Sequence, residues 1–268
     1  MPRLIYGTAW KAERTAQRVV QAVKTGFRGI DTAAQPKHYN EQGVGEALQE
    51  LREFGIERHQ LFIQTKFSPV GGQDLTRIPY NPHAALAVQV QESFANSLKN
   101  LKTDSVDSLV LHSPLAHWQE TLEVWSAMEG IYRQGGTKML GISNCYDLDL
   151  LIALHTQTEV KPAVVQNRFY PTTHYDVTLR RWSQNRGIAY QSFWTLTANP
   201  HLLESREIFG IAQAYGKTPA QILFCFLKQI GISPLTGTCS EKHMKEDLEI
   251  LHFNLLDSEI STLNNLIN

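Results

Sequence analysis

Residues 108–142 read SLVLHSPLAHWQETLEVWSAMEGIYRQGGTKMLGI, and this stretch contains the pattern that decides the fold. Residues 108–112 and 138–142 are short runs of β-forming residues at its two ends. Between them, apolar residues recur at the spacing of a helix with one buried face, at Leu122, Trp125, Met128, Ile131 and Tyr132. A helix between two strands predicts that the strands run parallel, because a tight turn cannot join a parallel pair.

The same alternation of strand and helix extends over the rest of the chain. Six further short β-forming runs lie at residues 4–8, 28–32, 61–66, 163–166, 187–192 and 231–234. Eight strands alternating with helices in 268 residues are typical of a closed barrel. We therefore predict an α/β fold of the (β/α)8 TIM-barrel type. No linker or internal repeat divides the sequence, so residues 1–268 are predicted to form one domain.

Composition excludes several classes of protein. The 25 Lys and Arg nearly balance the 26 Asp and Glu, which argues against a nucleic-acid partner. Cys145, Cys225 and Cys239 have neither zinc-site spacing nor an even number for disulfides, so we expect reduced thiols and a cytoplasmic protein. Apolar runs are too short for a membrane span, so no membrane partner is expected.

Polar residues fall at the carboxyl ends of several predicted strands, namely Asp31, Lys66, His112, Ser143, Asn144 and Gln166. One polar residue at a strand end is ordinary, but in a barrel all of these ends meet at one face, where barrel enzymes build their sites. A cation beside a phenol favours the phenolate, so a tyrosine near Lys66 is predicted to have a lowered pKa and to act as a general acid. Tyr39, in the loop after Asp31, is the candidate, and a neutral His112 would hydrogen-bond a substrate oxygen.

Motifs in order along the chain resemble those of the aldo-keto reductase superfamily. They are GIDTA (29–33), HYNE (38–41), VGEAL (44–48), QTKF (64–67), LVLHSP (109–114), GISN (141–144) and VVQN (164–167). The resemblance implies a nicotinamide cofactor, NADP with NAD as the alternative, that lies across the barrel mouth without a Rossmann glycine fingerprint. It also implies a catalytic tetrad of Asp31, Tyr39, Lys66 and His112. Aldehydes or ketones would be reduced by hydride transfer while Tyr39 protonates the carbonyl oxygen, and no metal is implied.

The resemblance also implies cofactor-binding and substrate-binding residues. Ser143, Asn144 and Gln166 would hydrogen-bond the nicotinamide carboxamide, and Phe193 would stack on its ring. The remaining implied cofactor residues are Gly7, Thr8, Asp31, Trp194, Thr195, Leu196, Thr236, Gly237, Thr238, Ser240, Lys242, His243 and Asp247. Lys242 and Lys245 either hold the adenosine 2′-phosphate as point charges or are solvated helix charges. Trp10, Tyr39 and His112 are the implied substrate contacts.

The sequence departs from the commonest family pattern in three places. One is the region of the adenosine 2′-phosphate, where residues 234–236 (Pro-Leu-Thr) and His243 stand in place of the usual Lys-Ser and Arg. Tyr39 lies eight residues after Asp31 instead of five, and alignment on Asn40 without a gap would put His38 in the tyrosine position. We predict Tyr39 as the acid because histidine has no phenol. The barrel is also expected to lack the usual N-terminal hairpin and to have a short C-terminal tail. This predicts an open pocket, with Trp10, Trp118 and the loop at residues 68–82 either as its walls or as ordinary packing and connection.

Two other classes of function remain as alternatives. One is a weakly catalytic, cofactor-binding regulatory or redox-sensing subunit. The other is a glycoside hydrolase that uses Glu41 and Asp31 as a carboxylate pair. The hypothesis of a hydrolase gives Lys66 and Gln166 no role, so we favour a reductase. The expected partner is a small carbonyl substrate, and the expected assembly is a monomer or a weak homo-oligomer.

Overall fold

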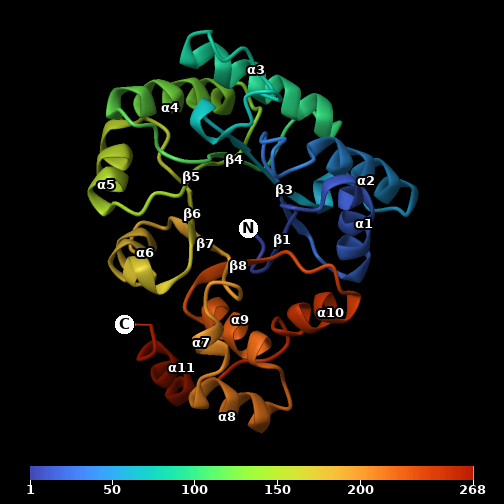
Figure 1. The fold of residues 1–268 in the computed structure, drawn as a ribbon, viewed down its shortest axis with the longest axis vertical. Coiled ribbons are helices and arrows are strands. Elements are labelled where there is room, and N and C mark those ends of the chain that lie inside the picture. The colour runs from blue at the N-terminus through green and yellow to red at the C-terminus, as the bar shows by residue number, and fades with distance from the viewer. Residues whose placement is uncertain (268) are drawn as a thin grey trace.

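Eight parallel strands form a closed barrel in the computed structural model, which describes residues 1–267 (Figure 1). The strands are β1 (Ile5–Gly7), β2 (Gly29–Asp31), β3 (Phe62–Phe67), β4 (Ser108–Leu111), β5 (Leu140–Ser143), β6 (Val164–Arg168), β7 (Ala189–Phe193) and β8 (Ile232–Thr236). Each strand pairs with the next in sequence, and β8 pairs with β1 to close the ring. The predicted TIM barrel and all eight predicted strands are confirmed, with strand ends shifted by one or a few residues.

Helices surround the barrel (Figure 1). They are α1 (Thr15–Thr25), α2 (Glu41–Glu53), α3 (Leu86–Leu101), α4 (Trp118–Arg133), α5 (Leu148–Gln157), α6 (Val177–Gln184), α7 (Pro200–Leu203), α8 (Arg206–Tyr215), α9 (Pro219–Gln229), α10 (Glu241–Glu249) and α11 (Asp257–Asn264). Short 3-10 helices are η1 (Ala12–Arg14), η2 (Arg58–Gln60), η3 (Val70–Gly72) and η4 (Pro171–Asp176). Among residues 1–267, no helix is both long and apolar enough to cross a membrane.

Helix boundaries and buried faces follow local sequence signals. The Thr218 hydroxyl caps α9 by accepting the Gln221 N–H at 3.2 Å, and Pro219 follows at the first helical position. On α4, Trp125, Met128 and Ile131 are buried in the core, as the helical spacing predicts. Tyr132, at the end of the same pattern, is 38% exposed because it lies near the end of the helix. The apolar pattern therefore predicts the face of α4 but not its extent.

Gly45 explains the glycine-rich start of α2. A Cβ atom at this position would lie 2.0 Å from the main-chain oxygen of Asn100, at the end of α3. Only glycine permits this close approach of α2 to α3. The GVGEAL sequence at residues 43–48 is therefore a packing motif here.

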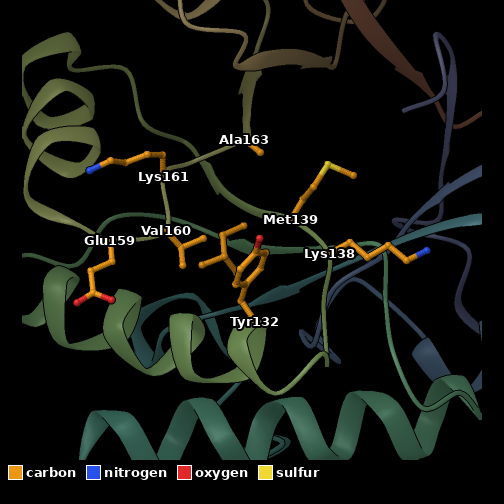
Figure 2. Close-up of a pocket in the computed structure, with 8 residues that line it drawn as sticks. Tyr132, Lys138, Met139, Glu159, Val160, Lys161 and Ala163 are labelled. Carbon is orange, nitrogen blue, oxygen red and sulfur yellow. The ribbon is translucent and has the colours of Figure 1, made fainter.

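A pocket of about 380 Å³ opens at the amino-terminal ends of β5 and β6 (Figure 2). Lys138 and Met139 lie just before β5, and Glu159 and Lys161 lie before β6. Its charged side chains already have partners, since Lys138 pairs with Asp107 at 2.8 Å and Glu159 pairs with Arg133 at 2.5 Å. The predicted site residues lie at the opposite, carboxyl ends of the strands, so this pocket is remote from them.

Candidate active site

A buried ion pair forms the centre of the candidate site. Lys66 on β3 donates to both carboxylate oxygens of Asp31 on β2 at 2.7 Å, and also to the Thr32 main-chain oxygen at 2.8 Å. Lys66 is 1% exposed and Asp31 is 2% exposed. Burial lowers the pKa of Lys66, while the neighbouring Asp31 carboxylate opposes that shift. The pair can exist in the core because each charge neutralises the other.

Tyr39 lies against this ion pair. Its ring centroid is 5.2 Å from the Lys66 Nζ atom and 6.0 Å from the centroid of the His112 ring. Asn40, the next residue, caps α2 by accepting the Gly43 N–H at 2.9 Å. This cap fixes the end of the loop that carries Tyr39.

The predicted lowering of the Tyr39 pKa is wrong in direction. Burial, and then the Asp31 charge, raise the pKa of Tyr39 above its usual value of 10.0. Lys66 does not reverse the shift because its own charge is paired with Asp31. Tyr39 therefore keeps its proton at neutral pH, which leaves it able to donate that proton.

His112 follows the last residue of β4 and is neutral. Its Nδ1 atom lies 2.5 Å from the Ser68 hydroxyl. Burial, then the charges of Lys66 and His38, lower the pKa of His112 from 6.5 to about 3. The imidazole is therefore uncharged at pH 7, and Ser68 fixes the orientation of its ring.

His38 takes a different position from Tyr39. Its ring packs on the Trp10 ring with centroids 3.9 Å apart, and its main-chain oxygen accepts the Trp10 N–H at 2.8 Å. Its enclosed Nδ1 atom has no hydrogen-bond partner among residues 1–267. Trp10 is 65% exposed at this rim. Of the two neighbouring candidates, Tyr39 is the one that contacts Lys66.

A network of glutamines lies beneath the ion pair. Gln64 and Gln166 donate to the same Asp31 oxygen at 2.7 and 3.0 Å, and both donate to Gln191 Oε1 at 2.7 and 2.8 Å. Both amide hydrogens of Gln166 are thereby used. Its Oε1 accepts no hydrogen bond from residues 1–267 and is not enclosed, so it is the polar atom that Gln166 can offer a ligand.

The other residues implied for the carboxamide lie beside Gln166. Ser143 donates to the Gln166 main-chain oxygen at 2.7 Å, and Asn144 donates to the His112 main-chain oxygen at 2.9 Å. Phe193 ends β7, one strand further round the barrel. The structure thus brings Ser143, Asn144 and Gln166 together next to the His112 backbone.

Other residues implied for the cofactor lie around the ends of β1, β7 and β8. Gly7 pairs with Asp31 in the sheet, and Thr8 donates to the Asp31 main-chain oxygen at 2.9 Å. Thr195 donates to Ser192 at 2.9 Å, between the exposed Trp194 and the half-buried Leu196. Lys11, which is 6% exposed, donates to the Gly237 main-chain oxygen.

The segment implied for the adenosine end leads from β8 into α10. The Thr238 main-chain oxygen accepts the Tyr6 hydroxyl at 3.0 Å, and Ser240 caps α10 by accepting the His243 N–H at 3.3 Å. Thr236 donates to Asp247 at 2.7 Å, and burial raises the pKa of Asp247 from 3.8 to about 6.

The two lysines considered for the 2′-phosphate lie on the exposed surface of α10. Lys242 is 3.7 Å from Glu246, and Lys245 is 2.7 Å from Glu241. Both pairs are exposed ion pairs within one helix, which are weak and easily rearranged. Neither lysine forms a hydrogen bond or an ion pair with residues 236–240.

Residues 68–82 lie at the carboxyl end of β3, as expected for a rim loop. Gln35 donates to the Gly72 main-chain oxygen at 2.6 Å, and Tyr80 donates to the Ser68 main-chain oxygen at 2.7 Å. These bonds hold the loop beside the segment that leads to Tyr39. Trp118 instead lies on α4, where its indole donates to Gln157 at 3.3 Å, which is a packing role.

Sequence analysis missed several residues of the site. They are Lys11, Gln64, Ser68, Arg168 and Gln191. Gln64, Arg168 and Gln191 each lie two positions from a predicted site residue on the same strand. Because strand side chains alternate, positions two apart face the same side, and this signal identifies all three.

The arrangement defines a class of protein: a (β/α)8 barrel with an enclosed lysine–carboxylate pair next to a tyrosine and a neutral histidine at the carboxyl ends of its strands. No group of three His, Cys, Asp or Glu residues within 1–267 is placed to hold a metal ion. The chemistry that these side chains can perform is proton transfer and hydrogen bonding.

Comparison with known proteins gives the family. The model of the Aldo/keto reductase family matches residues 3–268. An uncharacterized oxidoreductase of Bacillus subtilis, YtbE, is 34% identical over 92% of this chain and 83% of its own length. Methylglyoxal reductase DkgA of Escherichia coli K12 is 28% identical over 98% of this chain and 88% of its own. A silkworm aldo-keto reductase complexed with NADPH has a TM-score of 0.82 at 26% identity, covering 100% of this chain and 85% of that one.

This chain belongs to the aldo/keto reductase family, a family of oxidoreductases. The resemblance found in its motifs is confirmed.

Proposed function

We propose that this protein reduces small aldehydes or ketones to alcohols with NADPH as the hydride donor. The observation that carries the proposal is the position of Tyr39, with its ring 5.2 Å from the amine of the buried Lys66–Asp31 pair and 6.0 Å from the ring of neutral His112. Family membership supports the class of reaction. Relatives named for methylglyoxal and glyoxal reduction favour small aldehydes as the substrate class.

The residues at the barrel mouth fit a nicotinamide dinucleotide. The free Oε1 atom of Gln166 suits the amide N–H of a carboxamide. The enclosed amine of Lys11 suits a phosphate, since its bond to Gly237 joins a cation to a neutral carbonyl. A solved relative in complex with NADPH supports the choice of NADP over NAD.

Bound NADPH would supply the hydride, and side chains of this protein would donate the proton and orient the carbonyl group. His112 would hydrogen-bond the carbonyl oxygen and hold it near the Tyr39 hydroxyl. Tyr39 would donate its proton to that oxygen as the alcohol forms. The Lys66 cation would stabilise the tyrosinate left behind, and Asp31 would hold Lys66 in place. This division of roles accords with a raised Tyr39 pKa, because the acid must be protonated before the reaction.

The alternative of a weakly catalytic cofactor-binding subunit shares the cofactor site but needs no proton donor. It predicts binding of NADPH without turnover. Fluorescence titration with NADPH and NADH, followed by absorbance assays with methylglyoxal, separates the two. The reductase proposal expects tighter binding of NADPH than of NADH, and oxidation of NADPH on addition of the aldehyde. Binding without turnover across a panel of aldehydes and ketones would contradict it.

A further inference from the structure

The side chain of Arg168, at the end of β6, donates no hydrogen bond to any of residues 1–267. Its Nε atom is enclosed, yet it donates to nothing among residues 1–267. Within residues 1–267 the guanidinium forms no ion pair, and the hydrogen bond that Arg168 donates to Tyr146 comes from its main-chain N–H. The enclosed Nε–H has lost hydration without gaining a protein acceptor, and the Nη groups of this half-buried side chain are not enclosed. This makes Arg168 suited to an acceptor that comes from outside the protein.

Strand geometry places Arg168 at the barrel mouth. It lies two residues after Gln166, whose side chain faces the interior of the barrel, and alternation puts both on that side. In the sheet it pairs with Phe193 of β7. Its N–H donates at 3.2 Å to the Tyr146 hydroxyl, which in turn donates at 3.3 Å to Asn144. Arg168 therefore borders the residues proposed to hold the nicotinamide.

Aromatic rings hold the guanidinium in place. Its Cζ atom lies 4.1 Å from the centroid of the Trp194 ring and 5.4 Å from that of Tyr170. Tyr170 packs in turn on Tyr146, with centroids 6.1 Å apart. Stacking fixes the guanidinium plane while leaving its edge free to donate, and this arrangement favours a planar, bidentate anion such as a carboxylate.

Nearby groups leave the charge of Arg168 available. Asp176 is used by Asn167 and Tyr190, which donate to it at 2.7 and 2.8 Å. Lys11 follows β1 and donates to the Gly237 main-chain oxygen just after β8, and it is the cation proposed above for the cofactor pyrophosphate. Arg168 lies on β6, where its main-chain N–H is linked through the Tyr146 hydroxyl to Asn144. We therefore assign the anion that its guanidinium fits to the carbonyl substrate and not to the cofactor.

We propose that Arg168 binds a carboxylate on the substrate, so that the preferred substrates are carbonyl compounds that carry a carboxylate group. This inference rests on the proposed reductase function and names its substrate class. Trp194, which is 50% exposed, and Tyr170 position the guanidinium for that contact.

The test compares 4-carboxybenzaldehyde with its neutral methyl ester, methyl 4-formylbenzoate, at saturating NADPH. In Arg168→Gln we expect the KM for the acid to rise about tenfold to a hundredfold, since hydrogen bonds between charged groups are lost. The KM for the ester and the kcat for both are expected to change by less than about twofold. Arg168→Lys, which keeps the charge but not the fork, should recover part of the preference. Arg181→Gln, which removes an exposed arginine of α6, is the matched control and should behave as wild type.

Three results would overturn the inference. One is an equal change in KM for the acid and the ester, and another is no change for either. The third is a rise of more than about fivefold in the NADPH dissociation constant of Arg168→Gln, which would assign this cation to a cofactor phosphate. If the wild type reduces neither of these aldehydes nor methylglyoxal or any other member of the carbonyl panel, the proposed reductase function fails as well. Reduction of both aldehydes without preference in any variant refutes only the carboxylate site.

Discussion

At the scale of single residues, the site contains groups whose protonation states are set by burial. Asp31, Lys66 and His112 could be predicted from the sequence because each lies at or next to the carboxyl end of a strand, and these ends converge in a barrel. Tyr39 could be predicted as the residue beside them, but the direction of its pKa shift could not. That direction depends on burial and on the pairing of Lys66 with Asp31, neither of which a linear sequence reveals.

The neutral state of His112 predicts a loss of stability in acid. Its pKa is about 3 in the folded protein and 6.5 when unfolded, so the unfolded state binds the proton more tightly. The stability that the neutral His112 contributes to the folded protein is complete above pH 6.5 and is lost as the pH falls from 6.5 toward 3. We expect the free energy of unfolding, measured in urea, to fall between pH 7 and pH 4.5 in both proteins. The fall should be about 1–2 kcal/mol smaller in His112→Gln than in wild type. An equal loss in both proteins would contradict the assigned neutral imidazole.

At the scale of elements, periodicity and caps predict most of the architecture. The apolar spacing in α4 and the Thr218–Pro219 start of α9 both correspond to the structure. The helices α7 and α8, between β7 and α9, could not be predicted as separate elements. Short helices depend on tertiary contacts more than on a repeated apolar face.

Gly45 gives a sharp prediction at this scale. Gly45→Ala places a methyl group 2.0 Å from the Asn100 main-chain oxygen, so α2 and α3 must separate. We expect a loss of about 2–4 kcal/mol in the free energy of unfolding, as for other strained core changes.

Gly210→Ala in α8 is the matched control. A Cβ at Gly210 has nothing within 4 Å, and alanine is the better helix former, so this variant should be as stable as wild type or about 0.5–1 kcal/mol more stable. Equal destabilisation of both variants in urea would show that helix packing at Gly45 is not the cause.

At the scale of the whole molecule, the two ends of the barrel differ in role. The candidate site lies at the carboxyl ends of the strands and not at their amino-terminal ends. Strand register determines which residues of neighbouring strands lie side by side. The glutamine network and the aromatic rings around Arg168 depend on this register. Sequence reasoning on one strand at a time cannot supply that register. The same division separates the pocket of Figure 2, at the amino-terminal ends of β5 and β6, from the site.

Substitution in that pocket is therefore expected to leave catalysis unchanged. Lys138→Ala removes an ion pair whose lysine is 71% exposed, and such pairs contribute little. We expect kcat and KM for methylglyoxal to remain within about twofold of wild type. A tenfold fall in kcat/KM with unchanged thermal stability would show that the amino-terminal face takes part in the reaction.

The central claim is that Tyr39 donates the proton. Its most direct test is the rate of NADPH oxidation with an activated aromatic aldehyde for wild type, Tyr39→Phe and His38→Ala, with NADPH binding measured for each. We predict that Tyr39→Phe binds NADPH as wild type does but loses at least about a hundredfold in kcat, because a general acid contributes that much. His38→Ala should keep most of its activity. An inactive His38→Ala beside an active Tyr39→Phe would contradict the account.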